Sequence, residues 1–338
     1  MNSVKIRKIN LSAMSSSDVE SIDKILETSE DSTVFHTPIW KKIISDEFSL
    51  ESELLIAEIA GSPVGLYSYF VDKKYHIIKR HVFPLWDRYG GPIASTEREK
   101  VIRGLLQYAE SIWSGAPVGI SFALPPQTDI DVYKKAGYGL LMNSYPTSIL
   151  QLGKAEEDLW RGLKKNTRNA INNAIRHDLE IVDGSPSDIN KFYEMLLEVS
   201  KRASAFGDGV GFKVAPKTFY RKALRRLIPQ EMAKLSLAKY EGKIISATIF
   251  LFSNKKAFYW QNASDREYNK LSANNLLQWR FIQWANEKGF DTYDLMGTNH
   301  PNIAKFKRSF GGNEAVFYSV SKMSRISKLY RKARKFIR

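Results

Sequence analysis

The chain has 338 residues, and its 51 Lys and Arg exceed its 36 Asp and Glu to give a net charge of +15. Hydrophobic residues make up 43 % of the chain and charged residues 26 %, a composition typical of globular proteins that excludes a disordered chain, a collagen and a coiled coil. The absence of cysteine excludes disulfides, thiolate zinc sites and a cysteine nucleophile, and no apolar run approaches the roughly 18–20 residues that span a bilayer. We therefore expect a soluble cytoplasmic protein of about two domains.

The first half of the chain predicts strands and helices in alternation. Residues 53–72 form a predicted hairpin, residues 97–114 a helix, residues 117–126 a buried strand and residues 131–138 a short helix. Such alternation predicts a fold of the α/β (α+β) class.

The second half repeats this order about 180 residues later. The predicted elements are a hairpin over 234–253, a strand over 255–264, a helix over 273–289, a strand over 291–297 and a short helix over 303–312. The repetition predicts two tandem domains of one plan. We place them at residues 1–150 and 151–320, with a helical connector at residues 185–230 inside the second.

The surplus of positive charge is confined to the second half. Residues 1–150 hold 16 Lys and Arg against 18 Asp and Glu, whereas residues 151–338 hold 35 against 18. This asymmetry indicates an anionic partner such as a nucleic acid, a phosphorylated substrate or a membrane surface. One basic cluster lies at residues 161–177, where the spacing predicts a single amphipathic helix.

A second basic cluster is formed by residues 321–338, which hold eight Lys and Arg and no acidic residue. Apolar residues recur there at helical spacing, which predicts a basic amphipathic C-terminal helix. Such a helix either lies on an anionic membrane surface or docks on its own domain by the apolar stripe, and the pattern is the same in both cases.

Several common catalytic signatures are absent from the sequence. The five histidines show no metal-binding spacing, and the chain has no GxSxG elbow, no Walker-type phosphate loop and no GxGxxG motif after a strand. The sequence therefore predicts no metal site and no bound cofactor.

The order hairpin, strand, helix, strand, short helix also describes an acetyltransferase (GNAT) domain. That fold usually binds the pyrophosphate of coenzyme A on a glycine-rich loop that opens the central helix, where backbone N–H groups approach the phosphates. The corresponding segment here, SDREYNKLSANNLLQW, has no glycine. We therefore expect GNAT-like domains whose acyl donor is something other than coenzyme A.

Five segments of the chain follow one another in an order and spacing that match a known family. They are FHTPIW at 35–40, DRYGGP at 87–92, LWRGLKKNTRNAINNAIRHDLEI at 159–181, LSANNLLQWRFIQWANEKGFDTYDLMG at 271–297 and FKRSFGG at 306–312. Together they resemble the Fem family of peptidoglycan interpeptide-bridge aminoacyltransferases, over roughly residues 30–320. The chain has no room for the long helical arm that some members carry, so it resembles the compact, armless ones.

The resemblance implies both a fold and an activity. The implied fold is two GNAT-like domains. The implied activity transfers an amino acid from aminoacyl-tRNA to an amine of a cell-wall precursor that is UDP-linked or lipid-linked.

The resemblance also implies a role for the segment FKRSFGG, which matches the family's Phe-Lys pair followed by Phe-Gly. Lys307 becomes the candidate catalytic cation, and Phe306 would hold it or shape the groove. An amine that attacks an ester carbonyl builds negative charge on the oxygen, which a fixed ammonium stabilises. The alternative is a surface lysine beside a core phenylalanine.

Further substrate contacts are implied by the same resemblance. Trp40 with either Lys41 or Lys42 matches the Trp and Lys that contact the nucleotide-sugar phosphates, and Arg202 matches an arginine that binds the same diphosphate. The guanidinium fork suits phosphate geometry. The alternative for all of these residues is a solvated basic face.

Three residues near the predicted central helix are further candidates. Asp294 ends a predicted strand and either accepts a proton from the attacking ammonium or only orients Asn299 or Lys307. Tyr259 and Asn262 are candidates to line the acyl-donor site.

The basic segment 161–177 also has a place in this hypothesis. Lys164, Lys165 and Arg168 are candidate contacts to the tRNA acceptor end or another phosphate, which would make the affinity depend on salt. The sequence has no signature of a sequence-specific nucleic-acid binder.

Three functions stay open from the sequence. The first is aminoacyl transfer to a peptidoglycan precursor. The second is coenzyme A-dependent N-acylation of an amino sugar in surface-polysaccharide synthesis. The third is a non-catalytic protein that binds RNA or a membrane surface. We expect a cytoplasmic monomer, with a peripheral contact at the inner face of the membrane through residues 321–338 if that segment binds lipid.

Overall fold

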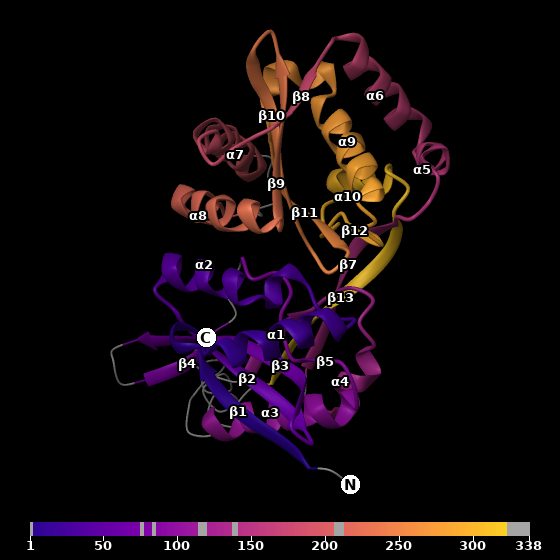
Figure 1. Ribbon diagram of the computed structural model, residues 1–338. Coiled ribbons are helices and arrows are strands. Elements are labelled where there is room, and N and C mark those ends of the chain that lie inside the picture. Colours follow the sequence, from indigo (N-terminus) through magenta and orange to yellow (C-terminus); the bar gives the residue numbers. More distant parts are fainter. Residues whose placement is uncertain are drawn as a thin grey trace, which may run out of the picture. The chain divides into compact units, whose positions relative to one another are not determined.

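The computed structural model describes residues 3–74, 78–82, 86–113, 120–136, 141–205 and 213–322 (Figure 1). Contacts divide the chain into two compact units, with Met1–Tyr145 and Val316–Arg338 in unit 1 and Pro146–Ala315 in unit 2. Residues 316–320, expected in the second domain, therefore lie in unit 1, and residues 146–150, expected in the first, lie in unit 2. The predicted C-terminal helix at 321–338 lies outside the described residues, except for its first two positions, which end a strand.

Unit 1 contains a mainly antiparallel sheet with helices on both faces. Its elements in chain order are β1 (Val4–Asn10), α1 (Ser16–Thr28), α2 (Pro38–Phe48), β2 (Glu51–Ile59), β3 (Ser62–Lys74), β4 (Ile78–Val82), β5 (Ile93–Ala94), α3 (Arg98–Trp113), β6 (Ile120–Leu124), α4 (Ile130–Ala136) and the start of β7 (Leu141–Gln151). The hydrogen-bonded order is β1-β2-β3-β4, with β5 beside β3.

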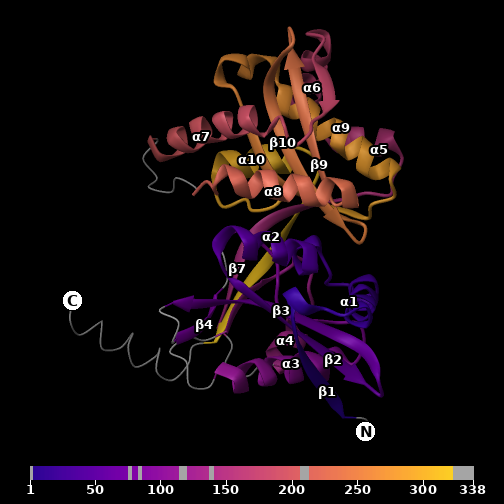
Figure 2. The same ribbon diagram turned by 60° about the vertical axis from the view of Figure 1, so that its left-hand side comes forward.

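Alternation along β2 explains how this sheet holds a core on each face. Successive strand residues point to opposite faces. Leu55 and Ala57 accordingly join the core cluster that contains α3, whereas Leu54 and Ile56 join the cluster that contains α1. Helix α3 also packs beside α4 (Figure 2).

Unit 2 contains a second sheet with helices on both faces. Its elements are the end of β7, α5 (Glu156–Gly162), α6 (Lys165–Arg176), β8 (Glu180–Asp183), α7 (Ile189–Ala205), α8 (Lys217–Leu227), β9 (Ala233–Tyr240), β10 (Lys243–Ser253), β11 (Lys256–Ser264), α9 (Ala273–Glu287), β12 (Thr292–Asp294), α10 (Pro301–Arg308) and the start of β13 (Asn313–Lys322). The strands of the unit follow the order β7-β12-β11-β10-β9-β8. Helices α6 and α9 lie on one side of these strands and α7 and α8 on the other (Figure 1).

In each half of the chain, the strand that follows the short helix pairs with a strand of the other unit. Strand β7 follows α4 of unit 1 and pairs with β12 of unit 2 through Leu150↔Tyr293 and its neighbours. Strand β13 follows α10 of unit 2 and pairs with β6 of unit 1 through Val320↔Phe122 and its neighbours. Each unit is therefore completed by a strand that the other half of the chain supplies.

The sheet of unit 2 splits between β11 and β12. These two parallel strands pair only over three residues, from Lys256↔Thr292 to Phe258↔Asp294, whereas β11 continues to Ser264. Strand β11 also carries a bulge, because its register against β10 shifts between Ile249 and Phe250. Bulges are frequent beside active sites, where they re-aim side chains.

The basic segment at 161–177 is two helices rather than the single helix expected. Helix α5 ends at Gly162 and α6 begins at Lys165, because Leu163 and Lys164 have extended backbone angles. The backbone N–H of Lys164 donates to the Ser309 carbonyl at 2.9 Å, and Leu163 is buried. These long-range contacts fix the break.

Among the described residues, none of the helices combines the length and the apolar character needed to cross a membrane.

Candidate active site

Lys307 is placed by the last turn of α10. This helix begins with Pro301 in its first turn, where the missing N–H costs no hydrogen bond, and buries Ala304 and Lys307 on one side. Lys307 is 9 % exposed although it carries a charge, whereas Lys305 of the same helix is exposed. A buried ammonium needs hydrogen-bond acceptors around it.

The backbone after β12 supplies those acceptors. The Lys307 Nζ donates to the carbonyl oxygens of Met296 and Gly297, at 3.0 Å each. It also lies 5.3 Å from the ring centroid of Tyr259 on β11, within the range of a cation–π contact. The ammonium thus contacts both β11 and the segment that follows β12, the two strands between which the sheet splits.

Tyr259 and Asn262 belong to one polar network with the first turn of α9. The Nδ2 of Asn262 donates to the Oδ1 of Asn274 at 3.0 Å and to the Oγ1 of Thr248 at 2.9 Å. The Nδ2 of Asn274 donates to the Tyr259 hydroxyl at 3.3 Å. Burial raises the pKa of Tyr259 above its usual value, so the phenol stays neutral.

This first turn does not fit the pyrophosphate of coenzyme A as a GNAT domain usually holds it. It contains no glycine that would let the phosphates approach the backbone closely. The Asn274 side chain is engaged with Asn262 and Tyr259, and the N–H groups of Asn275 and Leu276 donate to the Ser272 carbonyl. The residues of this turn therefore do not fit coenzyme A.

Asp294 is the last residue of β12 and is 3 % exposed. Its Oδ1 accepts from the Thr147 hydroxyl at 2.6 Å and from the Met296 N–H at 2.7 Å. The proton-accepting role of Asp294 stays a prediction, while these two hydrogen bonds connect it to the segment that binds Lys307.

Phe306 precedes the buried lysine and is half-buried. Its ring packs edge-on against Phe310, with centroids 5.1 Å apart, and it borders the main core of unit 2. The ring therefore helps to fix the last turn of α10.

Trp40 and Lys41 lie on α2 in unit 1 and are fully buried. The Trp40 Nε1 donates to Asp87 Oδ1 at 3.0 Å, and the Lys41 Nζ donates to Asp87 Oδ2 at 2.6 Å. Burial raises the pKa of Asp87 and lowers that of Lys41, and the contact between them offsets part of both shifts. Lys41 thus faces a carboxylate in the interior.

Two other predicted phosphate contacts are accessible to solvent. Lys42 is exposed, with its Nζ 3.9 Å from Asp46 one turn further along α2. Arg202 lies near the end of α7 in unit 2 and is partly exposed. Lys42 is thus exposed, whereas its neighbour Lys41 is buried.

The three basic residues at the start of α6 differ in their surroundings. Lys164 and Lys165 are exposed. The Arg168 guanidinium instead donates to the carbonyl oxygens of Arg161, at 3.1 Å, and of Leu163. Arg168 therefore holds the junction between α5 and α6, where carbonyls at a helix end need donors.

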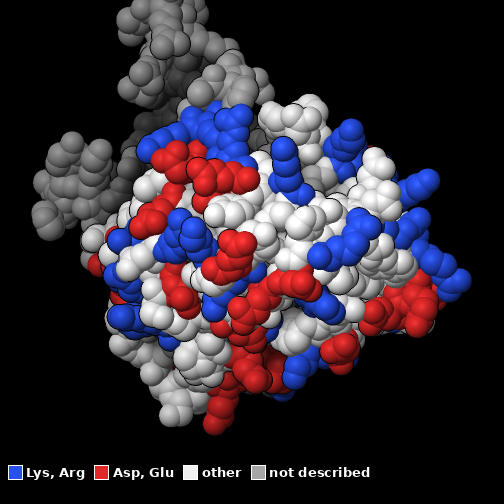
Figure 3. Space-filling view, turned by 90° about the horizontal axis from the view of Figure 1, so that it is seen from above, with Lys and Arg blue, Asp and Glu red and all other residues white. Residues whose placement is uncertain are grey.

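Lys and Arg are mixed with Asp and Glu on the face shown in Figure 3. Blue and red side chains both occur across this face.

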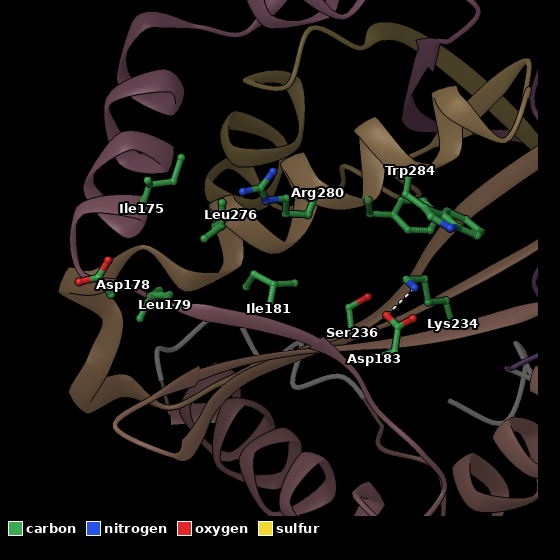
Figure 4. A pocket seen from close by; sticks show the side chains of 11 residues that line it. Ile175, Asp178, Leu179, Ile181, Asp183, Lys234, Ser236, Leu276, Arg280 and Trp284 are labelled. Atoms are coloured by element: carbon green, nitrogen blue, oxygen red, sulfur yellow. Dashed lines mark ion pairs between the residues drawn. The ribbon is translucent and has the colours of Figure 1, made fainter.

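A cavity of about 620 Å³ in unit 2 contains none of the predicted site residues (Figure 4). It lies between the end of α6, strands β8 and β9, and α9, with Ile175, Arg280 and Trp284 on its walls. Lys234 and Asp183 form an ion pair at its edge, and the Lys234 Nζ lies 5.2 Å from the Trp284 ring centroid. Among the described residues, no group of three or more His, Asp or Glu is arranged to hold a metal ion.

Three residues that support these sites are not predicted from the sequence. Asp87 lies in the segment DRYGGP that carries the resemblance, but its buried partners are 46 and 47 positions away. Thr147 and Met296 act through hydrogen bonds that no local pattern reveals.

Comparisons with known proteins agree with the expected fold. A family model described as "Acetyltransferase (GNAT) domain" matches residues 161–308. A solved structure described as FemX is similar over 93 % of this chain and 96 % of its own, with a TM-score of 0.73 and 14 % identity. A tandem GNAT protein from the clavulanic acid biosynthesis pathway covers 94 % of this chain and 98 % of its own, with a TM-score of 0.53 and 10 % identity. The expected fold class, tandem GNAT-like domains of α/β type, is confirmed.

A curated relative is similar in sequence over a shorter stretch. The lipid II:glycine glycyltransferase of Staphylococcus saprophyticus is 36 % identical over 89 residues, which are 24 % of this chain and 21 % of that protein. The chain thus matches about a fifth of the length of this relative. This sequence similarity agrees with the resemblance to the Fem family, and the likeness to FemX shows a shared fold.

Proposed function

We propose that the chain is an acyltransferase of the Fem type, which moves an amino acid from aminoacyl-tRNA to an amine of a peptidoglycan precursor. The observation that carries this proposal is the Lys307 ammonium, 9 % exposed and held by two backbone carbonyls where β11 and β12 separate. The similarity to a lipid II:glycine glycyltransferase supports a cell-wall precursor as the acceptor.

The proposed reaction is aminolysis of an ester. The acceptor amine attacks the carbonyl carbon of the aminoacyl ester, and the carbonyl oxygen becomes an oxyanion. Lys307 donates a hydrogen bond to that oxyanion, and its low exposure makes the interaction stronger than it would be in water. The carbon–oxygen bond to the tRNA ribose then breaks, the amine loses a proton, the ribose oxygen gains one, and an amide remains.

The donor assignment rests on the first turn of α9. Because that turn does not fit the coenzyme A pyrophosphate, an ester donor such as aminoacyl-tRNA is favoured. Lys164 and Lys165, both exposed, are the proposed phosphate contacts of the donor. Lys42 is the candidate phosphate contact of unit 1, and Arg202 is the candidate phosphate contact of unit 2.

A donor assay tests the proposal. The purified protein is incubated with radiolabelled aminoacyl-tRNA or with radiolabelled acetyl coenzyme A, and with lipid II or a UDP-linked muropeptide as acceptor. We expect label in the acceptor only with aminoacyl-tRNA. Transfer only from the coenzyme A donor would instead indicate N-acylation, and transfer from neither donor would exclude both enzymes.

Two lysines of α10 provide a matched pair for the same assay. Lys307→Ala is expected to lower turnover about 100- to 1,000-fold, the usual effect of removing an oxyanion donor. Lys305→Ala lies two residues away on the exposed face and should leave turnover within about twofold. Equal turnover of the two variants would contradict the role of Lys307.

A further inference from the structure

The backbone that binds Lys307 has an unusual conformation. Met296 has a φ of 59°, in the left-handed region that residues other than glycine and asparagine rarely adopt. Gly297 follows it, and the carbonyl oxygens of these two residues are the ones that accept from the Lys307 Nζ. A left-handed residue at this point turns two successive carbonyls toward one ammonium, and its conformational cost must be offset by surrounding contacts.

Asp294 provides such a contact. Its Oδ1 accepts the Met296 N–H at 2.7 Å, which ties the left-handed residue to the end of β12. The same oxygen accepts the Thr147 hydroxyl at 2.6 Å, which ties the carboxylate to β7. Asp294 and Thr147 are 3 % and 1 % exposed, so both hydrogen bonds are shielded from water.

We propose that Asp294 is a positioning residue, which acts on the reaction by holding the turn at Met296 that directs two carbonyls at the Lys307 ammonium. This inference rests on the proposed role of Lys307. It differs from a general-base role, because a base must contact the attacking amine, whereas the Asp294 Oδ1 already accepts from two protein donors. In this arrangement the hydrogen-bonding capacity of Oδ1 matters more than the ability of the carboxylate to take a proton.

The two roles predict different results for two substitutions. Asparagine keeps an Oδ1 that accepts from both Thr147 and Met296, but it cannot act as a base. Asp294→Asn should therefore keep kcat/KM within about tenfold of the unmodified protein, whereas Asp294→Ala should lose about 100-fold, because small displacements of a catalytic group have effects of that size.

Thr147 provides an independent pair of variants outside the carboxylate. Thr147→Ser keeps the hydroxyl donor, and Thr147→Val keeps the shape without it. We expect Thr147→Val to lower kcat/KM, as Asp294→Ala does, and Thr147→Ser to keep the kcat/KM of the unmodified protein. If Asp294→Ala does not fold, as judged by its circular dichroism spectrum, the Thr147 pair still decides the question.

Labelling of Lys307 gives a readout that does not need turnover. Each variant is treated briefly with a low concentration of acetic anhydride, and acetylation of Lys307 relative to Lys305 is measured by peptide mass spectrometry. Asp294→Ala and Thr147→Val should raise the relative labelling of Lys307 at least several-fold, because the two carbonyls no longer hold the ammonium in place. Asp294→Asn and Thr147→Ser should leave it close to the unmodified value.

Two results would overturn the inference. One is unchanged Lys307 labelling in both Asp294→Ala and Thr147→Val. The other is a loss of turnover in Asp294→Asn as large as in Asp294→Ala, with Lys307 labelling unchanged, which is the result expected for a base. If the unmodified protein shows no transfer with any donor, the proposed function fails, whereas the labelling experiment still decides whether Asp294 positions Lys307.

Discussion

Two neighbouring lysines of α2 show how strongly the surroundings of a residue decide its role. The resemblance points to Trp40 with Lys41 or Lys42 and does not choose between the lysines. Lys41 is fully buried against Asp87, whereas Lys42 is exposed beside Asp46. Lys42 therefore stays the candidate phosphate contact, whereas Lys41 supports the fold.

The first prediction separates these roles. Lys41→Met removes one partner of a buried ion pair and leaves the Asp87 carboxylate without its cation, which should lower the free energy of unfolding by about 3–5 kcal/mol. Lys42→Met should change it by less than about 0.5 kcal/mol and should instead raise the KM for the acceptor. Urea denaturation followed by circular dichroism measures the first effect, and transfer kinetics measure the second.

A double variant is the control for the buried pair. Lys41→Met combined with Asp87→Asn removes both charges and keeps an acceptor for the Trp40 N–H, so it should cost less than the sum of the single variants. If Lys41→Met and the unmodified protein had the same denaturant midpoint, this result would contradict the structural role of Lys41.

The second prediction concerns Gly311 of the segment FKRSFGG and Gly162, which lies against it. Gly311 has a φ of +84°, and an added Cβ would lie 2.9 Å from the Gly162 carbonyl oxygen. Gly311→Ala should therefore destabilise the protein by about 2 kcal/mol or more, because both the backbone conformation and the close approach oppose a side chain. Gly162→Ala meets nothing within 4 Å and lies at the end of α5, where alanine should stabilise by about 0.5–1 kcal/mol.

These two glycines face each other, so the matched pair tests the close approach directly. Thermal unfolding of both variants gives the comparison, and the expected shifts have opposite signs. Shifts of the same sign and size would show that the approach of Gly311 to Gly162 does not contribute to stability.

At the residue scale, the sequence names candidate site residues more readily than the residues that hold them in place. Lys307 and Tyr259 were both candidates, and the structure places the Lys307 Nζ 5.3 Å from the Tyr259 ring. Met296 was not found, because its left-handed conformation depends on hydrogen bonds to it rather than on its residue type. Asp87 was missed since its partners on α2 lie far away in the chain.

At the scale of elements, helix periodicity predicted α9 well and misjudged the segment at 161–177. The central helix was expected over 273–289 and spans Ala273–Glu287. The pattern at 161–177 is also helical, but the chain breaks at Leu163 and Lys164 because Ser309 accepts the Lys164 N–H and the core takes up Leu163. Periodicity reports local preference, and such a tertiary contact overrides it.

The third prediction concerns the start of α1 and its pH dependence. Ser15 caps this helix and forms a capping box with Asp18, whose carboxylate also pairs with Arg7 of β1. The Arg7 contact and the hydrogen bond from the Ser15 N–H lower the pKa of Asp18 below its usual value. The stabilisation is therefore complete above that value and is lost as the pH falls through the lower pKa of the folded state.

Asp18→Asn should lower the free energy of unfolding by about 1 kcal/mol at pH 7, and the difference from the unmodified protein should vanish in strong acid. Glu20→Gln, an exposed change on the same helix, should alter the free energy of unfolding at pH 7 by less than about 0.5 kcal/mol. Chemical denaturation at a series of pH values measures both. A destabilisation by Asp18→Asn that stays constant down to strong acid would contradict the assignment.

At the scale of the whole molecule, the repeated order of elements was visible in the sequence, and the exchange of final strands was not. Hairpin, helix, strand and short helix recur in this order in both halves, which predicts two units of one plan. Strand partners, however, are set by side-chain packing between distant segments. Val320 of β13 is fully buried in the core cluster of unit 1 with Phe122 and Tyr133. Nothing in its local sequence indicates that destination.

The exchange leads to the fourth prediction, on fragments of the chain. Residues 1–145 lack β13, so β6 loses the pairs from Tyr318↔Leu124 to Lys322↔Ile120, and the core loses Val320. Burial of one such side chain contributes about 1.5–3 kcal/mol, so this fragment should unfold at a clearly lower urea concentration than a version with residues 313–322 joined to its end by a flexible linker. The same version carrying Val320→Asp should gain little, because a charge replaces the buried side chain. Residues 146–315 keep β8 to β12 and the part of β7 that pairs with β12. This fragment should unfold cooperatively alone, as followed by circular dichroism. Equal midpoints for the 1–145 fragment with and without the added strand would contradict the contribution of β13 to unit 1.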